Sequence, residues 1–488
     1  MAQKPNHYTR LNLPLDATPE EVRRAYREAA RRLHPDINAE AGDTQLFLGI
    51  QEAYEILSDP ERRSAYDSEL HKRTGNHQPI NVNTLYSRTK LPRIKEPQLI
   101  YVTITLSPDE VDDTSAAPPT NLCLVIDSST SMQGIWMDMV KSTGIELARQ
   151  MGPNDILSLV SFNDRAEVLV SGGTSEDYQK FSSSIRMLLT RGGTEIFQGL
   201  QTGVNLVNTY RRKGYVNHVI LLTDGHTYGD EANCLELANQ AASQGIGITT
   251  LGIGTRWNDV FLDTLASRTG GASAYIRDPE QIRTLLSEAF NGISKSFADN
   301  LTYNFDTGPN VDLKYVFRLQ PEVTPLEIES PLKFGHIPKN GDCSLILEFL
   351  IHELPEDVNY LNLTKGRVSA DVPNLPDSQV EVRLDLSREI SSGATFETPP
   401  PAIMKAMSRL TLYRMQEQAQ KELAVGQVKE ATRRLQHMAT HLLSLGESDL
   451  ALAVLKEVDN LKSTSSLSEE GIKRIKYGTR SLVKPSPG

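Results

Sequence analysis

Five oxygen-bearing side chains in the centre of the chain have the types and positions of a cation-binding site. Three belong to the run Asp127-Ser128-Ser129-Thr130-Ser131, which follows directly on the apolar stretch Leu122–Ile126. The others come later, one in a Gly-Gly-Thr turn and one directly after the Leu-Leu-Thr end of another apolar stretch. Ligands of open α/β sheets bind outside the carboxyl ends of the strands, so these segments could converge. The candidate ligands are Asp127, Ser129, Ser131, Thr194 and Asp224.

Two carboxylates and three hydroxyls are all hard oxygen donors, with no imidazole or thiolate among them. Mg²⁺ prefers near-octahedral oxygen coordination and keeps water positions, so we expect Mg²⁺, with Mn²⁺ and Ca²⁺ as alternatives. If one carboxylate binds only through water, the ion stays electrophilic and can accept a carboxylate from a partner protein. The structural alternative is a metal-free scaffold in which Asp127 and Ser129 only cap the next helix.

A second candidate site lies near the N-terminus, at His34-Pro35-Asp36. Thr18-Pro19-Glu20-Glu21 predicts a helix start, because Thr18 can cap the helix and Pro19 suits its first position. Pro35 cannot continue that helix. A second amphipathic helix follows, so a polar loop would display His34, Pro35 and Asp36 at its tip. The predicted apolar faces are Val22, Ala25, Tyr26, Ala29 and Leu33 on the first helix and Phe47, Ile50, Ala53, Tyr54 and Leu57 on the second.

The first of these helices also carries a basic stripe. Arg23, Arg27 and Arg31 recur every four residues, whereas Arg24 has an acidic partner four residues before it. The stripe has no such partners, which makes it available to an acidic surface. A solvated basic face is the simpler alternative.

The elements that must position these groups change along the chain. Residues 5–70 are predicted to be helical, 71–97 to be a polar linker, and 98–117 to contain a strand with alternating apolar residues that pairs with later strands. Residues 118–297 alternate apolar runs with helical patterns, which indicates a parallel sheet covered by helices on both faces. The apolar runs are Leu122–Ile126, Ile156–Phe162, Val219–Leu222 and Ile246–Ile253.

The remainder of the chain carries no catalytic constellation. Residues 298–395 read as an antiparallel β-sandwich, into which the α/β domain would be inserted. Residues 400–482 read as three helices in a small bundle or a helical-repeat-like pair, with Gly426 and Gly446 marking two helix ends. The basic run Lys473–Arg480 in the last helix is either a docking segment or a solvated helix end.

Composition limits the classes of function. The net charge of −11 argues against general nucleic-acid binding, which requires a basic face. No signal peptide and no membrane span are visible. Three isolated cysteines, Cys123, Cys234 and Cys343, predict neither a disulfide framework nor a zinc site and fit a reducing compartment, which indicates the cytoplasm.

Residues Tyr8 to Asp67 resemble a J-domain. The resemblance rests on Val22, Tyr26, the two helical patterns, Ser58-Asp59-Pro60 and His34-Pro35-Asp36 between the helices. It implies that the tripeptide triggers ATP hydrolysis in a DnaK-type chaperone and that the basic helix docks on that chaperone. No Gly/Phe-rich segment or cysteine-rich zinc region follows, which puts general binding of unfolded substrates in doubt. The docking residues carried over are Arg23, Arg24, Arg27 and Arg31.

Residues Pro118 to Ser296 resemble a von Willebrand factor A domain, which implies a Rossmann-like fold. The five oxygen donors match the metal-ion-dependent adhesion site of that family, and Leu251-Gly252-Ile253-Gly254-Thr255 is typical of its members. The resemblance implies a protein ligand that supplies an acidic residue to the metal. Residues expected around the metal are Ser128, Thr130, Met132, Trp136, Arg191, Glu195, His226, Thr227 and Tyr228.

These features favour a multidomain co-chaperone that stimulates a DnaK-type ATPase and captures partners through a Mg²⁺-dependent site. The alternative is a metal-dependent scaffold in complex assembly or signalling, with a dispensable J-domain. A metal-dependent hydrolase is disfavoured, because His226 is the sole candidate base near the metal and no phosphate loop is present. We therefore expect a protein that is not an enzyme.

Overall fold

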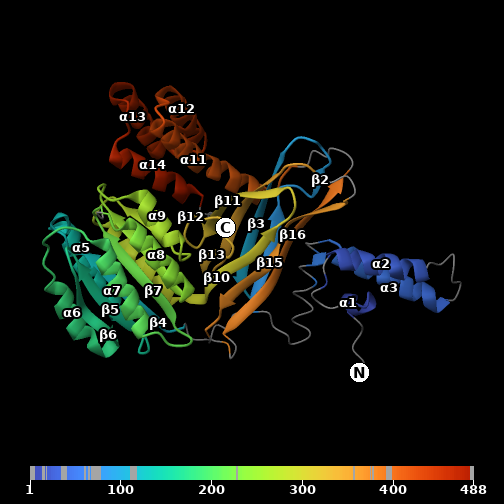
Figure 1. Cartoon of the computed structure of the whole chain (residues 1–488), viewed down its shortest axis with the longest axis horizontal. Coiled ribbons are helices and arrows are strands. Elements are labelled where there is room, and N and C mark those ends of the chain that lie inside the picture. Colours follow the sequence, from blue (N-terminus) through green and yellow to red (C-terminus); the bar gives the residue numbers. More distant parts are fainter. Residues whose placement is uncertain are drawn as a thin grey trace. The chain divides into compact units, whose positions relative to one another are not determined.

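The structure is a computed structural model (Figure 1) that describes residues 6–13, 17, 19–33, 41–59, 62–63, 66, 79–109, 118–226, 229–354, 358–373, 375, 378–391 and 398–483. The chain divides into two compact units, Met1–Thr84 with Ile104–Glu110 and Leu85–Thr103 with Val111–Gly488. Within the described ranges, no helix has the length and apolar character required to cross a membrane.

The helices of the first unit whose bounds the structure describes are α1 (His7–Arg10), α2 (Pro19–Leu33) and α3 (Ala41–Leu57), and residues 62–63 and 66 are also helical. The predicted apolar faces of α2 and α3 pack together, and the rings of Tyr26 and Tyr54 stack with their centroids 4.1 Å apart. Both helices are amphipathic, so burying these faces is what holds the pair together. The core consists of Tyr8, Leu11, Ala17, Val22, Ile50, Ala53 and Leu57.

The α/β domain is built on a six-stranded sheet of order β6-β5-β4-β7-β8-β9. All neighbours are parallel except β6, which is antiparallel at one edge. The four predicted apolar runs form the four central strands, as expected for strands that are buried on both faces. The strands are β4 (Thr120–Asp127), β5 (Ile156–Phe162), β6 (Ala166–Gly173), β7 (Val216–Thr223), β8 (Ile246–Ile253) and β9 (Ser273–Ile276).

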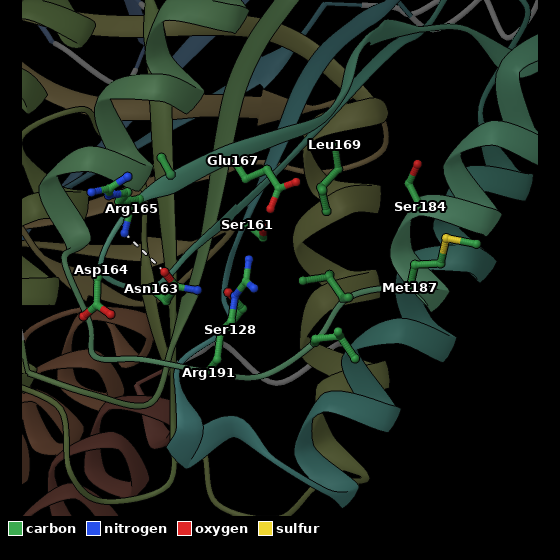
Figure 2. A pocket seen from close by; sticks show the side chains of 13 residues that line it. Ser128, Ser161, Asn163, Asp164, Arg165, Glu167, Leu169, Ser184, Met187 and Arg191 are labelled. Carbon is green, nitrogen blue, oxygen red and sulfur yellow. Dashed lines mark hydrogen bonds between the residues drawn. The ribbon is translucent and has the colours of Figure 1, made fainter.

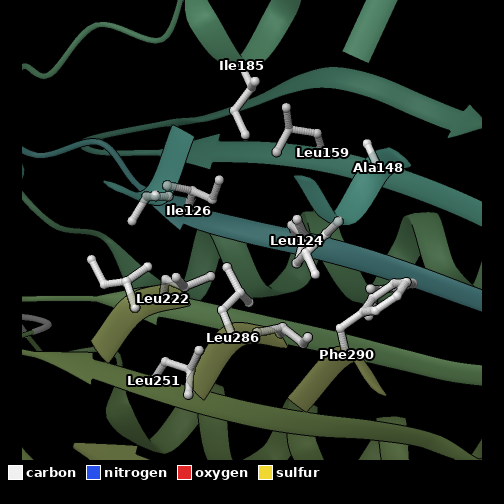
Figure 3. Close-up of a cluster of buried hydrophobic side chains, with 14 of the residues drawn as sticks. Leu124, Ile126, Ala148, Leu159, Ile185, Leu222, Leu251, Leu286 and Phe290 are labelled. Carbon is white, nitrogen blue, oxygen red and sulfur yellow. The ribbon is translucent and has the colours of Figure 1, made fainter. Parts of the chain in front are cut away.

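Helices cover both faces of this sheet, because successive side chains of each strand point to opposite sides. Leu122, Leu124 and Ile126 of β4 face α5 (Ile135–Gln150), α6 (Tyr178–Arg186) and α10 (Gln281–Ser294), as Figure 3 shows in part. Cys123 and Val125 face α7 (Ile196–Thr209), α8 (Glu231–Ser243) and α9 (Asp259–Ser267). All three cysteines of the chain are buried and free.

Two five-stranded sheets form the strand-rich region, with the orders β1-β3-β14-β11-β12 and β13-β10-β15-β16-β2. The long neighbouring strands β10 and β13, β10 and β15, β11 and β14, and β15 and β16 pair antiparallel. The strands are β1 (Ile80–Tyr86), β2 (Lys90–Pro92), β3 (Gln98–Pro108), β10 (Ser296–Thr307), β11 (Val311–Gln320), β12 (Thr324–Pro325), β13 (Leu332–Pro338), β14 (Cys343–Ile351), β15 (Tyr360–Asp371) and β16 (Gln379–Ser391).

The predicted linker over residues 71–97 is not a linker throughout. Strands β1 and β2 lie within it, and β2 pairs in parallel with β16, with Lys90 opposite Glu389. A strand that precedes the α/β domain thus joins a sheet made of strands that follow it. The α/β domain is therefore an insertion into the strand-rich region.

The C-terminal helical domain has four helices, and the prediction of three was wrong. They are α11 (Pro401–Ala424), α12 (Val428–Ser444), α13 (Ser448–Thr464) and α14 (Glu469–Leu482). Gly426 and Gly446 lie at the first two turns with φ of +79° and +82°, conformations that glycine adopts without strain. The third turn uses Ser465 at φ +58°, so the sequence has no glycine to mark it.

Candidate functional site

The candidate metal site begins where β4 and β7 end side by side. Asp127 is the last residue of β4 and is fully buried. Its carboxylate accepts a hydrogen bond from the hydroxyl of Thr223, the last residue of β7, at 2.7 Å, and one from the backbone N–H of Ser129 at 2.8 Å. The parallel register of the two strands thus fixes the position and rotation of this carboxylate.

The second carboxylate of the site is held by the serines of the first loop. Ser131 donates to Asp224 Oδ1 at 2.7 Å, and the hydroxyls of Ser129 and Ser131 lie 3.0 Å apart. Ser129 Oγ is 3.4 Å from the same carboxylate oxygen. Four of the five predicted ligands therefore form one connected cluster of oxygen atoms.

Thr194, the fifth predicted ligand, borders the same cluster. A Cβ atom added to Gly225, the residue after Asp224, would lie 2.9 Å from Thr194 Oγ1. This close approach brings the Gly192-Gly193-Thr194 turn against the end of β7, and a side chain at position 225 would separate them. The structure thus brings all five predicted residues to the same edge of the sheet.

The electrostatics of the cluster are unfavourable for two ionised carboxylates. Burial raises the pKa of Asp127 to about 6, against the hydrogen bonds from Thr223 and Ser129 that lower it. Burial likewise raises the pKa of Asp224. Across the described residues, the one ion pair to either group comes from Arg256, whose Nη2 lies 3.7 Å from Asp224 Oδ2 on a side chain that is 66% exposed. The cluster is therefore short of positive charge.

Neighbouring loops hold the site loop in place through their backbones. Arg191 N donates to Ser128 O at 2.8 Å, and Thr130 N donates to Gly192 O at 3.3 Å. Gly192 has a φ of +75°, and a Cβ there would lie 2.3 Å from Asp164 Oδ2, so the turn requires glycine. Asp164 in turn accepts from Gly193 N at 2.8 Å.

The other residues expected around the metal divide into two groups. Ser128 and Met132 are buried and Trp136 packs partly against the core, so these three support the loop instead of offering contact surface. Thr130, Arg191 and His226 are exposed, and Glu195 is partly exposed. Thr227 and Tyr228 lie outside the described residues.

The N-terminal candidate site is described only in part. His34, Pro35 and Asp36 lie outside the described residues. Arg24, Arg27 and Arg31 are exposed along α2, whereas Arg23 is only partly exposed and interacts with a neighbour. The predicted docking face is thus open at three positions and not at Arg23.

The basic run in α14 is neither a solvated helix end nor an open docking segment. Lys476 Nζ lies 2.8 Å from Asp263 Oδ2 and also pairs with Asp259, both on α9. Arg480 Nη1 donates to Asp263 Oδ1 at 3.0 Å. Burial alone would raise the pKa of Asp263, but the charges of Arg480 and Lys476 hold it well below its usual range. Sequence reasoning missed this network, which fastens α14 to the α/β domain.

Two residues at the metal site were also missed. Thr223 precedes Asp224 directly and orients Asp127 from the next strand. Arg256 follows the predicted Gly254-Thr255 strand end, so its position at the same edge of the sheet could have been inferred from the parallel topology.

Family models match three parts of the chain. The DnaJ domain model matches residues 6–67, the von Willebrand factor type A domain model matches residues 121–288, and the model of the Sll0103-like, C-terminal alpha-helical domain matches residues 401–485. The matched ranges coincide with the helical region of the first unit, the α/β domain and the four C-terminal helices.

Two curated relatives cover different parts of the chain. The uncharacterized protein sll0103 of Synechocystis sp. is 26% identical over 387 residues, which are 77% of this chain and 91% of that protein. The chaperone protein DnaJ 2 of Thermus thermophilus is 47% identical over 68 residues, which are 14% of this chain and 24% of that protein. The likeness to this chaperone protein thus covers a stretch about as long as the DnaJ domain at residues 6–67.

Solved structures share the fold of the larger unit. A von Willebrand factor type A protein from Catenulispora acidiphila has a TM-score of 0.65 at 15% identity, covering 82% of this chain and 96% of its own. The ArnB paralog VWA2 from Sulfolobus acidocaldarius has a TM-score of 0.54 at 16% identity, covering 84% and 100%. The chain is therefore a multidomain protein with an N-terminal DnaJ domain and a central von Willebrand factor type A domain.

Proposed function

We propose that this protein is a co-chaperone that stimulates a DnaK-type ATPase and captures partner proteins through a Mg²⁺-dependent site in its von Willebrand factor type A domain. Both matched domains are typically interaction modules without catalytic activity. The observation that carries the metal half is the cluster of Asp127 and Asp224, two buried carboxylates surrounded by hydroxyls and nearly devoid of cations. Buried charges are normally paired or bound to metal.

The donor set fits Mg²⁺, with Mn²⁺ and Ca²⁺ as alternatives. Every candidate ligand supplies oxygen, and the described part of the chain contains no group of three or more His, Cys, Asp or Glu side chains that could hold another kind of ion. The residues that would hold the ion are Asp127, Ser129, Ser131, Thr194 and Asp224. The bound ion would supply an electrophilic position for a carboxylate of the partner.

The chaperone half rests on the DnaJ domain and on its basic face. Arg24, Arg27 and Arg31 are exposed on α2 and present positive charge to an acidic surface of the ATPase. His34, Pro35 and Asp36 follow that helix in sequence and are the residues we assign to stimulation. The buried, free cysteines fit a reducing compartment, such as the cytoplasm, where such a chaperone would be met.

Single-turnover ATP hydrolysis by the DnaK-type chaperone of the same source tests this proposal. We expect the wild-type protein to accelerate hydrolysis and His34→Gln to abolish the acceleration without loss of folding. His437→Gln, at an exposed position of α12, is the matched control and should behave as wild type.

Two results would contradict the proposed stimulation of a DnaK-type chaperone. Acceleration that survives His34→Gln would remove the tripeptide from the mechanism. No acceleration by the wild type would favour the alternative, a metal-dependent scaffold in complex assembly or signalling in which the J-domain is dispensable.

A further inference from the structure

A cavity of about 690 Å³ opens beside the candidate metal site, between the ends of β4 and β5 and helix α6 (Figure 2). Ser128 lines it, and this residue stands between the two metal-site residues Asp127 and Ser129. The cavity therefore adjoins the loop that carries the candidate metal ligands.

One wall of the cavity is apolar and unusually exposed. Met187 and Leu189 line it with relative exposures of 78% and 73%, and Leu169 and Leu188 continue the wall inward. Figure 2 shows Leu169 and Met187 on the same side of the cavity. Large apolar side chains gathered beside a binding site typically mark a surface that another molecule covers.

Hydrogen bonds hold the backbone of the segment that carries Met187 and Leu189. Lys141 Nζ donates to the carbonyls of Leu188 at 2.7 Å and Arg186 at 3.2 Å, which closes the end of α6. Arg191 N donates to Ser128 O at 2.8 Å and ties the end of the same loop to the metal-site loop.

The opposite wall and the mouth carry two arginines and two acidic residues. Arg165 and Arg191 are exposed, and neither guanidinium has a partner in the part of the chain that the structure describes. Of the two acidic residues in the lining, Asp164 is engaged by the N–H of Gly193 at 2.8 Å, which leaves Glu167. Arg165 and Arg191 are therefore available to pair with a carboxylate of a bound segment, whereas Asp164 is already hydrogen-bonded within the protein.

We propose that this cavity is a specificity pocket for an extended acidic segment of a partner protein, which places a bulky aliphatic side chain against Met187 and Leu189 while its carboxylate binds the metal. The inference rests on the proposed metal function and deepens it, because it names the ligand class. A metal ion alone would bind a carboxylate on any acidic surface, whereas an adjoining apolar contact distinguishes one acidic segment from another.

Binding of synthetic eight-residue peptides to the full-length protein, in Mg²⁺ and in EDTA, tests this assignment. Each peptide carries one Glu and, at one of the neighbouring positions, either Leu or Ser. We expect Mg²⁺-dependent binding, with at least one Leu position bound about tenfold more tightly than its Ser counterpart, as burial of one aliphatic side chain predicts.

The double variant Met187→Ser/Leu189→Ser should lose the preference for Leu and keep Mg²⁺-dependent binding of the Ser peptides. Both positions are exposed, so the substitutions leave the core intact. Val260→Ser on α9, an exposed apolar position outside the cavity lining, is the matched control and should retain the preference.

The outcomes separate the two levels of the proposal. Mg²⁺-dependent binding without a Leu preference, or with a preference that the double variant retains, overturns the specificity pocket and leaves the metal function standing. No Mg²⁺-dependent binding of any acidic peptide overturns the proposed metal function and the pocket with it.

Discussion

The von Willebrand factor type A domain contains one pair of partly buried aspartates and one pair of buried aspartates, and the protein surrounds the two pairs in opposite ways. Asp259 and Asp263 on α9 are met by Lys476 and Arg480 of α14, and the cations hold the pKa of Asp263 below its usual range. Asp127 and Asp224 are met by hydroxyls, and burial raises the pKa of both. The chain itself supplies two cations to the first pair, whereas Arg256 is the one cation paired with the second among the described residues.

The surroundings of the two pairs suggest different roles: we interpret the α9 aspartates as structural and, following the proposed metal function, the strand-end aspartates as ligands. A buried carboxylate costs free energy unless it is paired or bound to metal. The α9 pair is complete, so it can only fasten the C-terminal helical domain to the α/β domain. The pair at the strand ends has hydroxyls that add donor atoms but no charge, which is the arrangement that a divalent cation completes.

One short segment connects the two pairs. Arg256, which faces Asp224, is followed by Trp257, which is buried and has Lys473 of α14 5.0 Å from its ring centroid. Asp259 then begins α9. Helix α14 thus contacts both the two aspartates of α9 and the segment that contains Arg256. Among the described residues, Arg256 is the one cation near Asp127 and Asp224.

The largest expected effect on stability comes from breaking the ion pairs of Asp259 and Asp263 with α14, here called the closed pair. Asp263→Asn leaves Arg480 and Lys476 buried with too little negative charge, and breaking such a pair costs about 3–5 kcal/mol. Because the folded pKa of Asp263 is depressed, its contribution is present in full above the unfolded value of about 4 and is lost progressively as the pH falls from there through the folded pKa. Urea unfolding followed by the fluorescence of Trp257 at pH 7 and pH 3 measures the difference and its decline.

Asp459→Asn is the control for this prediction, because Asp459 makes an exposed pair with Lys462 on α13 and should change stability little. Equal effects of the two substitutions, or a difference that grows on acidification, would show that the α9 pair is not the closed one.

The next largest effect comes from neutralising Asp127, one member of the pair Asp127 and Asp224, here called the open pair. Asp127→Asn keeps the shape of the side chain, and Thr223 can accept from the amide where it donates to the carboxylate. Without metal we expect no loss of stability, because a buried charge without a cation has been removed. Wild type should gain about 2.7 kcal/mol at a Mg²⁺ concentration of 100 times Kd, and Asp127→Asn should gain none.

Unfolding with and without Mg²⁺ measures both quantities. Asp138→Asn, an exposed acidic residue in the first turn of α5, serves as the control and should respond to Mg²⁺ as wild type does. A Mg²⁺ response that persists in Asp127→Asn would place the ion elsewhere.

Sequence patterns were sufficient to predict those strands and site residues whose signal lies within a short stretch of the chain. Apolar runs gave the four central strands, because a strand buried on both faces needs continuous apolar residues. The oxygen donors could be assembled because parallel strands end at the same edge of the sheet. By contrast, β1 was assigned to a linker although Ile80 and Val82 alternate in it, since one short alternating stretch among polar residues is a weak signal.

The closed pair could not be predicted, because its two halves lie more than 200 residues apart in the chain. Asp259 and Asp263 stand four residues apart on one helix, a like-charge spacing that disfavours an isolated helix. Lys476 and Arg480 repeat that spacing in α14. Each half alone resembles a solvated charged face, and only the complementary spacing indicates that they meet.

The smallest expected effect concerns Arg256, the one cation near the open pair within the described residues. Its side chain is 66% exposed and lies 3.7 Å from Asp224, so Arg256→Gln should change stability by no more than about 0.5 kcal/mol. Because a guanidinium repels a dication bound nearby, the substitution should raise the affinity for Mg²⁺ by about threefold at low salt and less at high salt. Calorimetric titration at two salt concentrations measures this change, with Arg277→Gln, an exposed arginine paired with Asp278, as the control. If Arg256→Gln lowered the affinity instead, Arg256 would be positioning Asp224 for the metal, and the open pair would be partly organised by the chain itself.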